Sequence, residues 1–283
     1  MTRKLRTQSH LDSGTNARTE SISSNGCRNL SLIVATVAAT LLWASCSNTP
    51  AHQSSGFHAA QAAVSYDSLA RSFAPAAWWA LSDSPGSVTA ADSSDHGHRG
   101  STFGGVGFGY QGPFPAQSED AAAFFNGSTS GIETNYRPGF SELSVACWFN
   151  AESTADGALV VTDKSYSTKR GFQFVLGGPG SVYFIIGTGR NWKEVSSGAP
   201  QGFWAQAIAT YNGATLRLYV DGLEEASARL SGSMPAGQRG VAIGYDPTGT
   251  YHEFYGELAQ VQIFNYALTA TQVWSLYAAA QKV

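Results

Sequence analysis

The sequence predicts an all-β protein of the antiparallel sandwich class, with one short helix near its C-terminal end. Three observations lead to this fold class: short apolar runs alternate with polar residues beyond about residue 66, turn sequences separate them, and no amphipathic helices alternate with them. Aromatic residues make up 12% and charged residues 13% of the 283 residues. This composition suits a globular β protein with many turns and argues against disorder or a coiled coil.

Individual strands are predicted by period-2 alternation, because successive side chains of a strand point to opposite faces of a sheet. Five stretches show it most clearly: Leu143–Phe149, Phe172–Leu176, Val182–Ile186, Trp204–Thr210 and Leu216–Val220. Asn212-Gly213 and Asp221-Gly222 are strong hairpin-turn sequences, and Gly177–Gly180 forms a third short connection. Short connections favour antiparallel neighbours.

One helix is predicted at the C-terminal end. Thr269 and Gln272 have the spacing of a capping box, in which each side chain satisfies a free backbone N–H of the first helical turn. Val273, Leu276 and Tyr277 then fall on one face of the helix. We expect this face to pack against an edge or end of the sandwich.

Charge excludes one class of partner. The net charge is −3, and residues 1–45 hold five basic and two acidic residues of the 17 and 20 in the chain. The remainder therefore holds 12 basic and 18 acidic residues. A mildly acidic domain without a basic stripe lacks the electrostatic footprint of a nucleic-acid-binding protein, so we expect no nucleic-acid partner.

The N-terminal segment predicts export. Residues 1–45 form a signal segment, with a basic leader before the 14-residue apolar stretch Leu30–Trp43, which is too short to span a bilayer comfortably. Ala44 and Ser45 precede Cys46, and this arrangement resembles the lipobox of bacterial lipoproteins, whose cysteine is diacylated. We therefore expect a lipid-anchored protein of the bacterial cell envelope, with residues 46–65 as a flexible tether. The alternatives are a plain signal peptide, or an uncleaved anchor in which Cys46 is incidental.

The cysteines predict a domain without an internal disulfide. Cys27 would be lost on cleavage of the signal segment, and Cys46 is the lipidation candidate. Cys147 is left alone in an apolar strand, where a buried thiol behaves as a small hydrophobic group. The domain must then be held together by its core.

Five stretches, in the same order along the chain, resemble the laminin-G-like (concanavalin-A-like lectin/glucanase) family. They are Trp79–Leu81 with Asp92–Ser94, Ala122–Gly127, Leu143–Trp148, Trp204–Tyr211 with Leu216–Gly222, and Gly256–Leu268. The resemblance implies a concanavalin-A-like jelly-roll sandwich over residues 66–283. It also implies packing roles for Trp79, Trp148 and Trp204, and we expect Trp274 of the terminal helix to pack as well.

Some enzymes of this superfamily hydrolyse β-glucans with two carboxylates in an E-x-D-x-x-E pattern, which this sequence lacks. Glu224 and Glu225 are adjacent, so in a strand they point to opposite faces. Glu253 and Glu257 would lie about 13 Å apart in a strand, beyond the ~5–5.5 Å of a retaining glycosidase. We therefore assign no catalytic residues.

Relatives often bind Ca²⁺ beside the loop that carries Asp92, and the resemblance implies Asp92 and Asp95 as metal ligands here. Ala259 and Gln260 occupy the positions of the closing strand where relatives carry a partner acid. The alternative is a solvated turn in which the aspartate side chains bond to the backbone. His96 and His98 could suggest a pair of transition-metal ligands, but they lack a third ligand nearby in the sequence. We therefore expect them to be ordinary loop residues.

Sugar binding by such sandwiches relies on aromatic rings that stack on pyranose rings and on polar side chains of loops. Two predicted loop regions combine both kinds of residue. The candidate ligand-binding residues are Asp163, Tyr166, Trp192, Tyr245, Asp246, Tyr251 and His252. For Trp192, surface packing is an equally open alternative.

The predicted fold, the export signal and the absence of a catalytic carboxylate pair lead to one hypothesis. We expect the protein to be a non-catalytic binding module for a glycan or a cell-surface protein. The alternative is a polysaccharide-active enzyme, a glycoside hydrolase or lyase, with an unusual site. A third alternative is a structural role in envelope assembly, which a large exposed apolar patch would favour.

Overall fold

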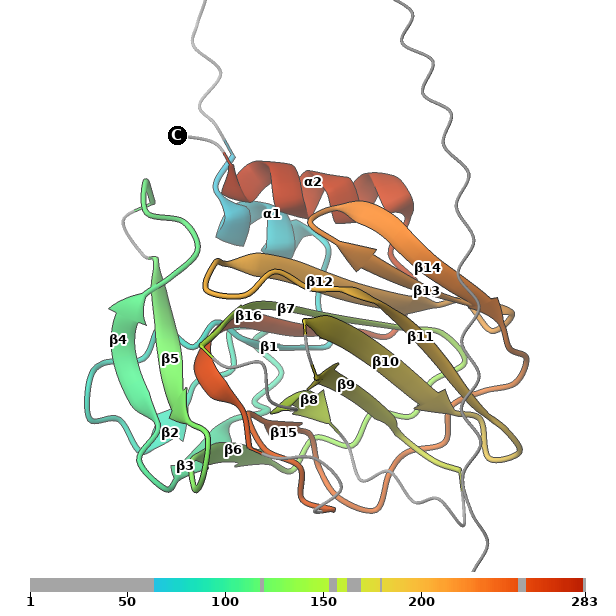
Figure 1. Ribbon diagram of the computed structural model, residues 1–283, viewed down its shortest axis with the longest axis horizontal. Coiled ribbons are helices and arrows are strands. Elements are labelled where there is room, and N and C mark those ends of the chain that lie inside the picture. Colours follow the sequence, from blue (N-terminus) through green and yellow to red (C-terminus); the bar gives the residue numbers. More distant parts are fainter. Residues whose placement is uncertain are drawn as a thin grey trace, which may run out of the picture. The chain divides into compact units, whose positions relative to one another are not determined.

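The computed structural model describes residues 64–117, 120–152, 157–161, 169–178, 180–248 and 253–281, and the structural statements below concern these residues (Figure 1). Residues 1–63, which include the predicted signal segment and Cys46, lie outside this part of the chain. The described chain is mostly β-strand, with two antiparallel sheets and two helices. The predicted sandwich class is confirmed.

Sheet A forms one layer of the sandwich. Its strands, in spatial order, are β14 (Leu223–Arg229), β13 (Thr215–Val220), β12 (Ala205–Tyr211), β7 (Leu143–Ala151), β16 (Tyr255–Phe264), β5 (Ala121–Asn126) and β4 (Gly107–Gln111), with β1 (Ala77–Trp79) also paired to β16. The predicted Asn212-Gly213 hairpin joins β12 to β13, and the Asn212 side chain accepts hydrogen bonds from the backbone N–H groups of Ala214 and Thr215. This turn explains the observed register, in which Tyr211 pairs with Leu216.

Sheet B forms the second layer. Its strands, in spatial order, are β11 (Trp192–Gly198), β10 (Ser181–Gly187), β9 (Phe172–Gly177), β8 (Gly157–Val161), β15 (Ala242–Ile243), β6 (Gly131–Thr134), β3 (Gly100–Phe103) and β2 (Thr89–Ala90). Strands β9, β10 and β11 follow one another in sequence and in space, as hairpin connections require. Strand β11, at the edge of sheet B, was not predicted. Its outward residues are polar, and the alternation of apolar and polar residues along it is weak.

The core lies between the facing sides of the two sheets. Phe149 of sheet A and Phe172, Phe174 and Phe184 of sheet B are fully or almost fully buried there. The Phe184 ring contacts both neighbours, at 5.6 Å from Phe172 and 5.3 Å from Phe174 between ring centroids. Burying each such side chain contributes about 1.5–3 kcal/mol to folding, so a core of this size replaces the missing disulfide. Cys147 lies in this core, and burial raises the pKa of its thiol.

Two helices cover part of the outer face of sheet A. Figure 1 shows α1 (Tyr66–Ser72) and α2 (Ala270–Ala280) side by side on this face. The Trp148 ring of β7 stacks on Tyr277 of α2, with centroids 6.1 Å apart and planes 12° apart. The predicted capping box of α2 is present. The helix lies on the face of the sheet and not only at an edge or end, because Trp148 and its neighbours offer an apolar surface there.

One expectation for this layer was wrong, and one of its helices was not predicted. Trp274 is 50% exposed, because it lies on the outward side of α2 while Val273 and Leu276 face the sheet. Helix α1 was not predicted; Ser65 caps its first turn by accepting a hydrogen bond from Ser68 N–H. A seven-residue helix gains little stability alone, so its packing on sheet A decides that it forms.

Candidate functional site

The sequence-predicted ligand-binding residues fall into two groups. Asp163, Tyr166, Tyr251 and His252 lie outside the described residues, so their arrangement stays a prediction. Trp192, Tyr245 and Asp246 are described, and they belong to sheet B or to the loop that follows it.

Trp192 and Tyr245 are not brought together. Trp192 is the first residue of β11, not a loop residue as expected, and its ring lies beside Gly187 of β10. Tyr245 follows β15 and packs edge-on against Phe103, with ring centroids 4.8 Å apart. Four strand spacings separate β11 from β15, which corresponds to about 19 Å. Burial, with the nearby Glu133 charge, raises the pKa of Tyr245 to about 12.

Asp246 stabilises its own loop. Its side chain is almost fully buried and accepts hydrogen bonds from Thr248 N–H at 2.8 Å and from the Thr248 hydroxyl at 2.7 Å. This is the geometry of an aspartate that closes a turn.

Trp192 borders a shallow pocket of about 490 Å³, which Lys193 and Arg229 also line.

The predicted metal ligands Asp92 and Asp95 point to different partners. Asp92 accepts hydrogen bonds from the backbone N–H groups of Trp78, Ser94 and His98, and its pKa is lowered, with burial opposing these bonds. Asp95 pairs with Arg71 at 3.1 Å.

Calcium takes six to eight oxygen ligands, and this loop fits it poorly. One Asp92 oxygen already accepts two of the backbone bonds, and Oε1 of Gln260 in the closing strand accepts a bond from the Trp78 indole. Within the described ranges, no group of three or more His, Cys, Asp or Glu side chains could hold a metal ion. Calcium binding here stays a prediction that the donor set does not favour.

A different surface combines aromatic rings with polar groups. It is the part of the outer face of sheet A that α1 and α2 leave open, on β4, β5, β7 and β16 (Figure 1). We call it the aromatic face, and it comprises Tyr110, Phe124, Tyr255, Asn150, Glu152 and Glu257. None of these residues was a predicted site residue.

Strand register builds a ladder of three rings on the aromatic face. Phe124 of β5 lies between Tyr110 of β4, stacked at 5.1 Å and 20°, and Tyr255 of β16, edge-on at 5.8 Å. Tyr110 and Tyr255 are 45% and 41% exposed. Gly107, opposite Phe124, carries no side chain, and the Tyr110 ring occupies the space above it. The two exposed tyrosine rings thus flank the partly buried Phe124 ring across three neighbouring strands.

The polar groups of the aromatic face lie beside the ladder. Glu257 of β16 pairs with Phe124 on one side and with Asn150 of β7 on the other. Burial raises the pKa of Glu257, and the like charge of Glu152 raises it further. Oε2 of Glu257 and Oδ1 of Asn150 are covered and have no hydrogen-bond partner among the described residues. The Glu257 carboxyl group is hydrogen-bonded to the Asn150 side chain, and one oxygen of each group keeps acceptor capacity that the described residues do not use.

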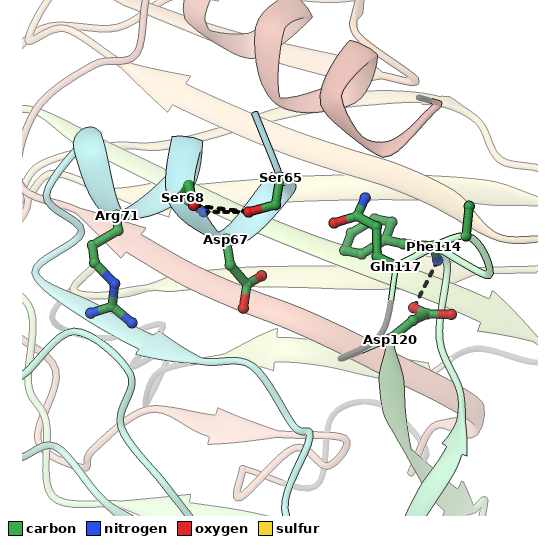
Figure 2. Close-up of a pocket in the computed structure, with 8 residues that line it drawn as sticks. Ser65, Asp67, Ser68, Arg71, Phe114, Gln117 and Asp120 are labelled. Atoms are coloured by element: carbon green, nitrogen blue, oxygen red, sulfur yellow. Dashed lines mark hydrogen bonds between the residues drawn. The ribbon is translucent and has the colours of Figure 1, made fainter. Parts of the chain in front are cut away.

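A pocket of about 630 Å³ opens beside the 112–120 loop, which joins the end of β4 to the beginning of β5. Figure 2 shows its lining residues: α1 contributes Asp67 and Arg71, and the 112–120 loop contributes Phe114, Gln117 and Asp120. This volume falls within the ~300–1,000 Å³ typical of small-ligand sites. Asp120 accepts a hydrogen bond from Phe114 N–H at 2.7 Å, and burial raises its pKa. We call this cavity the α1 pocket.

The other carboxylates considered for hydrolysis do not form a pair. Glu253 lies before β16 and bridges to Ala158 of sheet B, whereas Glu257 lies on the outer face of sheet A. Glu224 accepts from Arg217 Nε at 3.3 Å, an exposed ion pair of little energetic weight.

One sequence signal could have identified the aromatic face. In Ala121–Asn126, Phe125 faces the core, and alternation then places Phe124 outward. A single outward aromatic residue is common on protein surfaces, and such a residue marks a binding surface only when further rings join it in one patch. Its partners Tyr110 and Tyr255 come from distant strands, which periodicity alone does not pair.

Comparison with known proteins agrees with this architecture. A sequence model described as "Concanavalin A-like lectin/glucanases superfamily" (Laminin_G_3) matches residues 126–274. No curated protein matches the chain. In the described residues, no helix has the length and apolar character needed to cross a membrane.

Solved structures with the same fold include sugar-binding and toxin domains. Domain 4 of AbnA, a GH43 extracellular arabinanase from Geobacillus stearothermophilus solved with arabinotriose, aligns with a TM-score of 0.57 at 19% identity, over 71% of this chain and 97% of that domain. The botulinum neurotoxin serotype D binding domain aligns with a TM-score of 0.57 at 12% identity, over 74% of this chain and 52% of its own. The serotype G binding domain aligns with a TM-score of 0.52 at 16% identity, over 66% and 47%. The chain thus spans about half of the toxin domains, and these likenesses establish the fold alone.

Proposed function

The chain belongs to the concanavalin A-like lectin/glucanase superfamily, and from this premise we propose that it is a carbohydrate-binding module whose site is the aromatic face. The observation that carries the proposal is the ladder of Tyr110, Phe124 and Tyr255 beside unused hydrogen-bond acceptors. Rings on a rigid sheet can stack on the apolar faces of sugar rings without losing much conformational freedom. The neighbouring acceptors would then bond to sugar hydroxyl groups.

Support also comes from a structural relative. Domain 4 of AbnA was solved in complex with arabinotriose, and it aligns over nearly its whole length. A jelly roll of this size is therefore compatible with recognition of short oligosaccharides. The identity of 19% is too low to transfer individual binding residues.

Titration of the full chain with a panel of neutral oligosaccharides, arabinotriose among them, tests this proposal. We expect Tyr110→Ala and Tyr255→Ala each to weaken binding about two- to tenfold, since a stacked aromatic contributes roughly 0.5–1.5 kcal/mol. Phe103→Ala removes a ring of similar exposure from sheet B and serves as the matched control. Binding that is insensitive to both tyrosine changes but lost in Trp192→Ala would assign the site to sheet B instead.

A hydrolase is the second candidate, because Glu257 combines a raised pKa with a neighbouring carboxylate, Glu152. This is an arrangement found in acid–base pairs. Release of reducing ends from polysaccharides, abolished in Glu257→Gln, would establish it. Binding without turnover would leave the module assignment in place.

We also propose export and lipid attachment at Cys46, supported by the leader sequence alone. Two acyl chains would anchor the protein stably, because each buried CH₂ contributes about 0.8 kcal/mol. In a bacterial host, Cys46→Ser should move the chain from the membrane fraction to the soluble fraction. An unchanged distribution would argue for an uncleaved apolar anchor.

A further inference from the structure

We propose that the aromatic face selects oligosaccharides whose sugars carry free amino groups; this inference rests on the proposed carbohydrate-binding function and specifies its ligand class. The argument combines the charge of the face, the chemistry of its unused polar atoms and its aromatic rings.

The charged side chains of the aromatic face are all acidic. Strands β4, β5, β7 and β16 and the described residues of the loop 112–120 contain no lysine or arginine. Glu152 and Glu257 lie on the face itself, and Asp67 and Asp120 line the adjoining α1 pocket. A neutral glycan can donate hydroxyl hydrogen bonds to these carboxylates and an acidic glycan is repelled by them, whereas a cationic glycan also gains the attraction between opposite charges.

Arg71 does not neutralise this surface. Its guanidinium donates to Ser93 O at 3.0 Å, pairs with Asp95 at 3.1 Å and lies 5.2 Å above the Trp78 ring. Arg71 therefore makes its hydrogen bond, its ion pair and its ring contact with residues outside the pocket lining. Asp120 of the pocket contributes a further negative charge at the border of the aromatic face.

The unused polar atoms also specify a donor. Oε2 of Glu257 and Oδ1 of Asn150 can only accept hydrogen bonds, and a covered acceptor without a donor costs about 1–3 kcal/mol. An ammonium group brings three donors and a charge that Glu257 can pair with. A small rotation of the partly buried Glu257 side chain would bring its carboxylate to such a group.

The rings favour the same ligand. An ammonium group over the face of an exposed ring, Tyr110 or Tyr255, gains a cation–π attraction of about 0.5–2 kcal/mol. The apolar face of an amino sugar can stack on one ring of the ladder while its amine faces the next ring or Glu257. A neutral sugar stacks and donates hydroxyl hydrogen bonds but gains neither the cation–π attraction nor the ion pair.

The test compares two ligands of equal length, an oligosaccharide of glucosamine and its N-acetylated counterpart, titrated into the full chain at low ionic strength and at a pH where the amines are protonated. We expect the amino form to bind at least about tenfold more tightly, since close charge pairs couple by ~1.5 kcal/mol or more. Glu257→Gln and Glu152→Gln should remove most of this preference and leave the binding of the N-acetylated form. Glu194→Gln, the same charge change on sheet B, should leave the preference intact.

Three outcomes would overturn the inference. Equal affinity for both ligands, with both lost in Tyr110→Ala, refutes amine selection and leaves the carbohydrate-binding proposal standing. A second outcome is that oligolysine binds as tightly as the glucosamine oligosaccharide and that its binding depends equally on Glu257. The aromatic face would then recognise positive charge and not an amino sugar. Binding of neither these oligosaccharides nor any member of the neutral panel refutes both proposals together.

Discussion

The Trp78 indole nitrogen donates a hydrogen bond to Oε1 of Gln260 at 2.8 Å, and the two residues are buried between sheet A and α1. Gln260 lies in a bulge of β16, with a left-handed φ of 54° that non-glycine residues rarely adopt. Its amide nitrogen also donates to Asp67 of α1 at 3.2 Å. One side chain therefore links the closing strand to the first strand and the first helix, and its two bonds help to hold the strained bulge.

Replacing Gln260 by leucine should destabilise the protein by about 2–4 kcal/mol, because both bonds are lost and the Trp78 N–H stays buried without an acceptor. Urea denaturation followed by tryptophan fluorescence measures this cost. Gln262→Leu is the matched control, since its Oε1 contact with the Tyr66 hydroxyl is long, at 3.5 Å, and its amide nitrogen has no partner among the described residues. Equal costs in the two variants would contradict the bridging role of Gln260.

The two sides of α2 should respond differently to truncation. Leu276→Ala removes a fully buried side chain from the contact with sheet A and should cost about 2–5 kcal/mol. Trp274→Ala, in the same helix, removes a half-exposed ring and should cost about 1 kcal/mol or less. Thermal unfolding of both variants compares them, and a larger loss for Trp274→Ala would mean that α2 is docked by its other side.

Glu257→Gln should stabilise the protein at neutral pH. The folded-state pKa of Glu257 is raised above 4.5 by burial and by Glu152, so the folded protein binds this proton more tightly than the unfolded chain does. Stability from this group is therefore lost as pH rises from about 4.5 through the raised pKa. The glutamine variant escapes this loss, and its gain in melting temperature should shrink as the pH falls towards and below 4.5.

Melting curves across this pH range check the prediction, with Glu194→Gln as the control for removing one charge. A gain in Glu257→Gln that is independent of pH would point to packing and not to ionisation. If the variant is more stable and has also lost its amine preference, Glu257 carries a stability cost for the sake of binding.

Local chemistry explains which features could be predicted. The hairpin at Asn212-Gly213 and the capping box of Thr269 and Gln272 depend on neighbours within three residues, so the sequence alone specifies them. Cys147 could be placed in the core because its strand alternates clearly. Strand β11 was missed because edge strands carry polar residues on their open side, and Trp192 was therefore placed in a loop.

The candidate site depended on long-range pairing instead. Alternation in β5 puts Phe124 on the outer face, but only the pairing of β5 with β4 and β16 places Tyr110 and Tyr255 beside it. Asp246 was a reasonable binding candidate by residue type, and only its bonds to Thr248 show that it stabilises a turn. The sequence could not distinguish an outward polar or aromatic residue that binds a ligand from one that serves its own loop.

The sequence by itself determined the antiparallel sandwich, its hairpins, the terminal helix and a core without disulfides, because each follows from periodicity and from contacts between near neighbours. Only the tertiary structure decided which part of the outer face of sheet A stays open. Helices α1 and α2, from opposite ends of the domain, cover Trp148 and leave Phe124 and Glu257 at the surface. Coverage of a sheet depends on elements about 200 residues apart in the chain, and no local pattern encodes their docking.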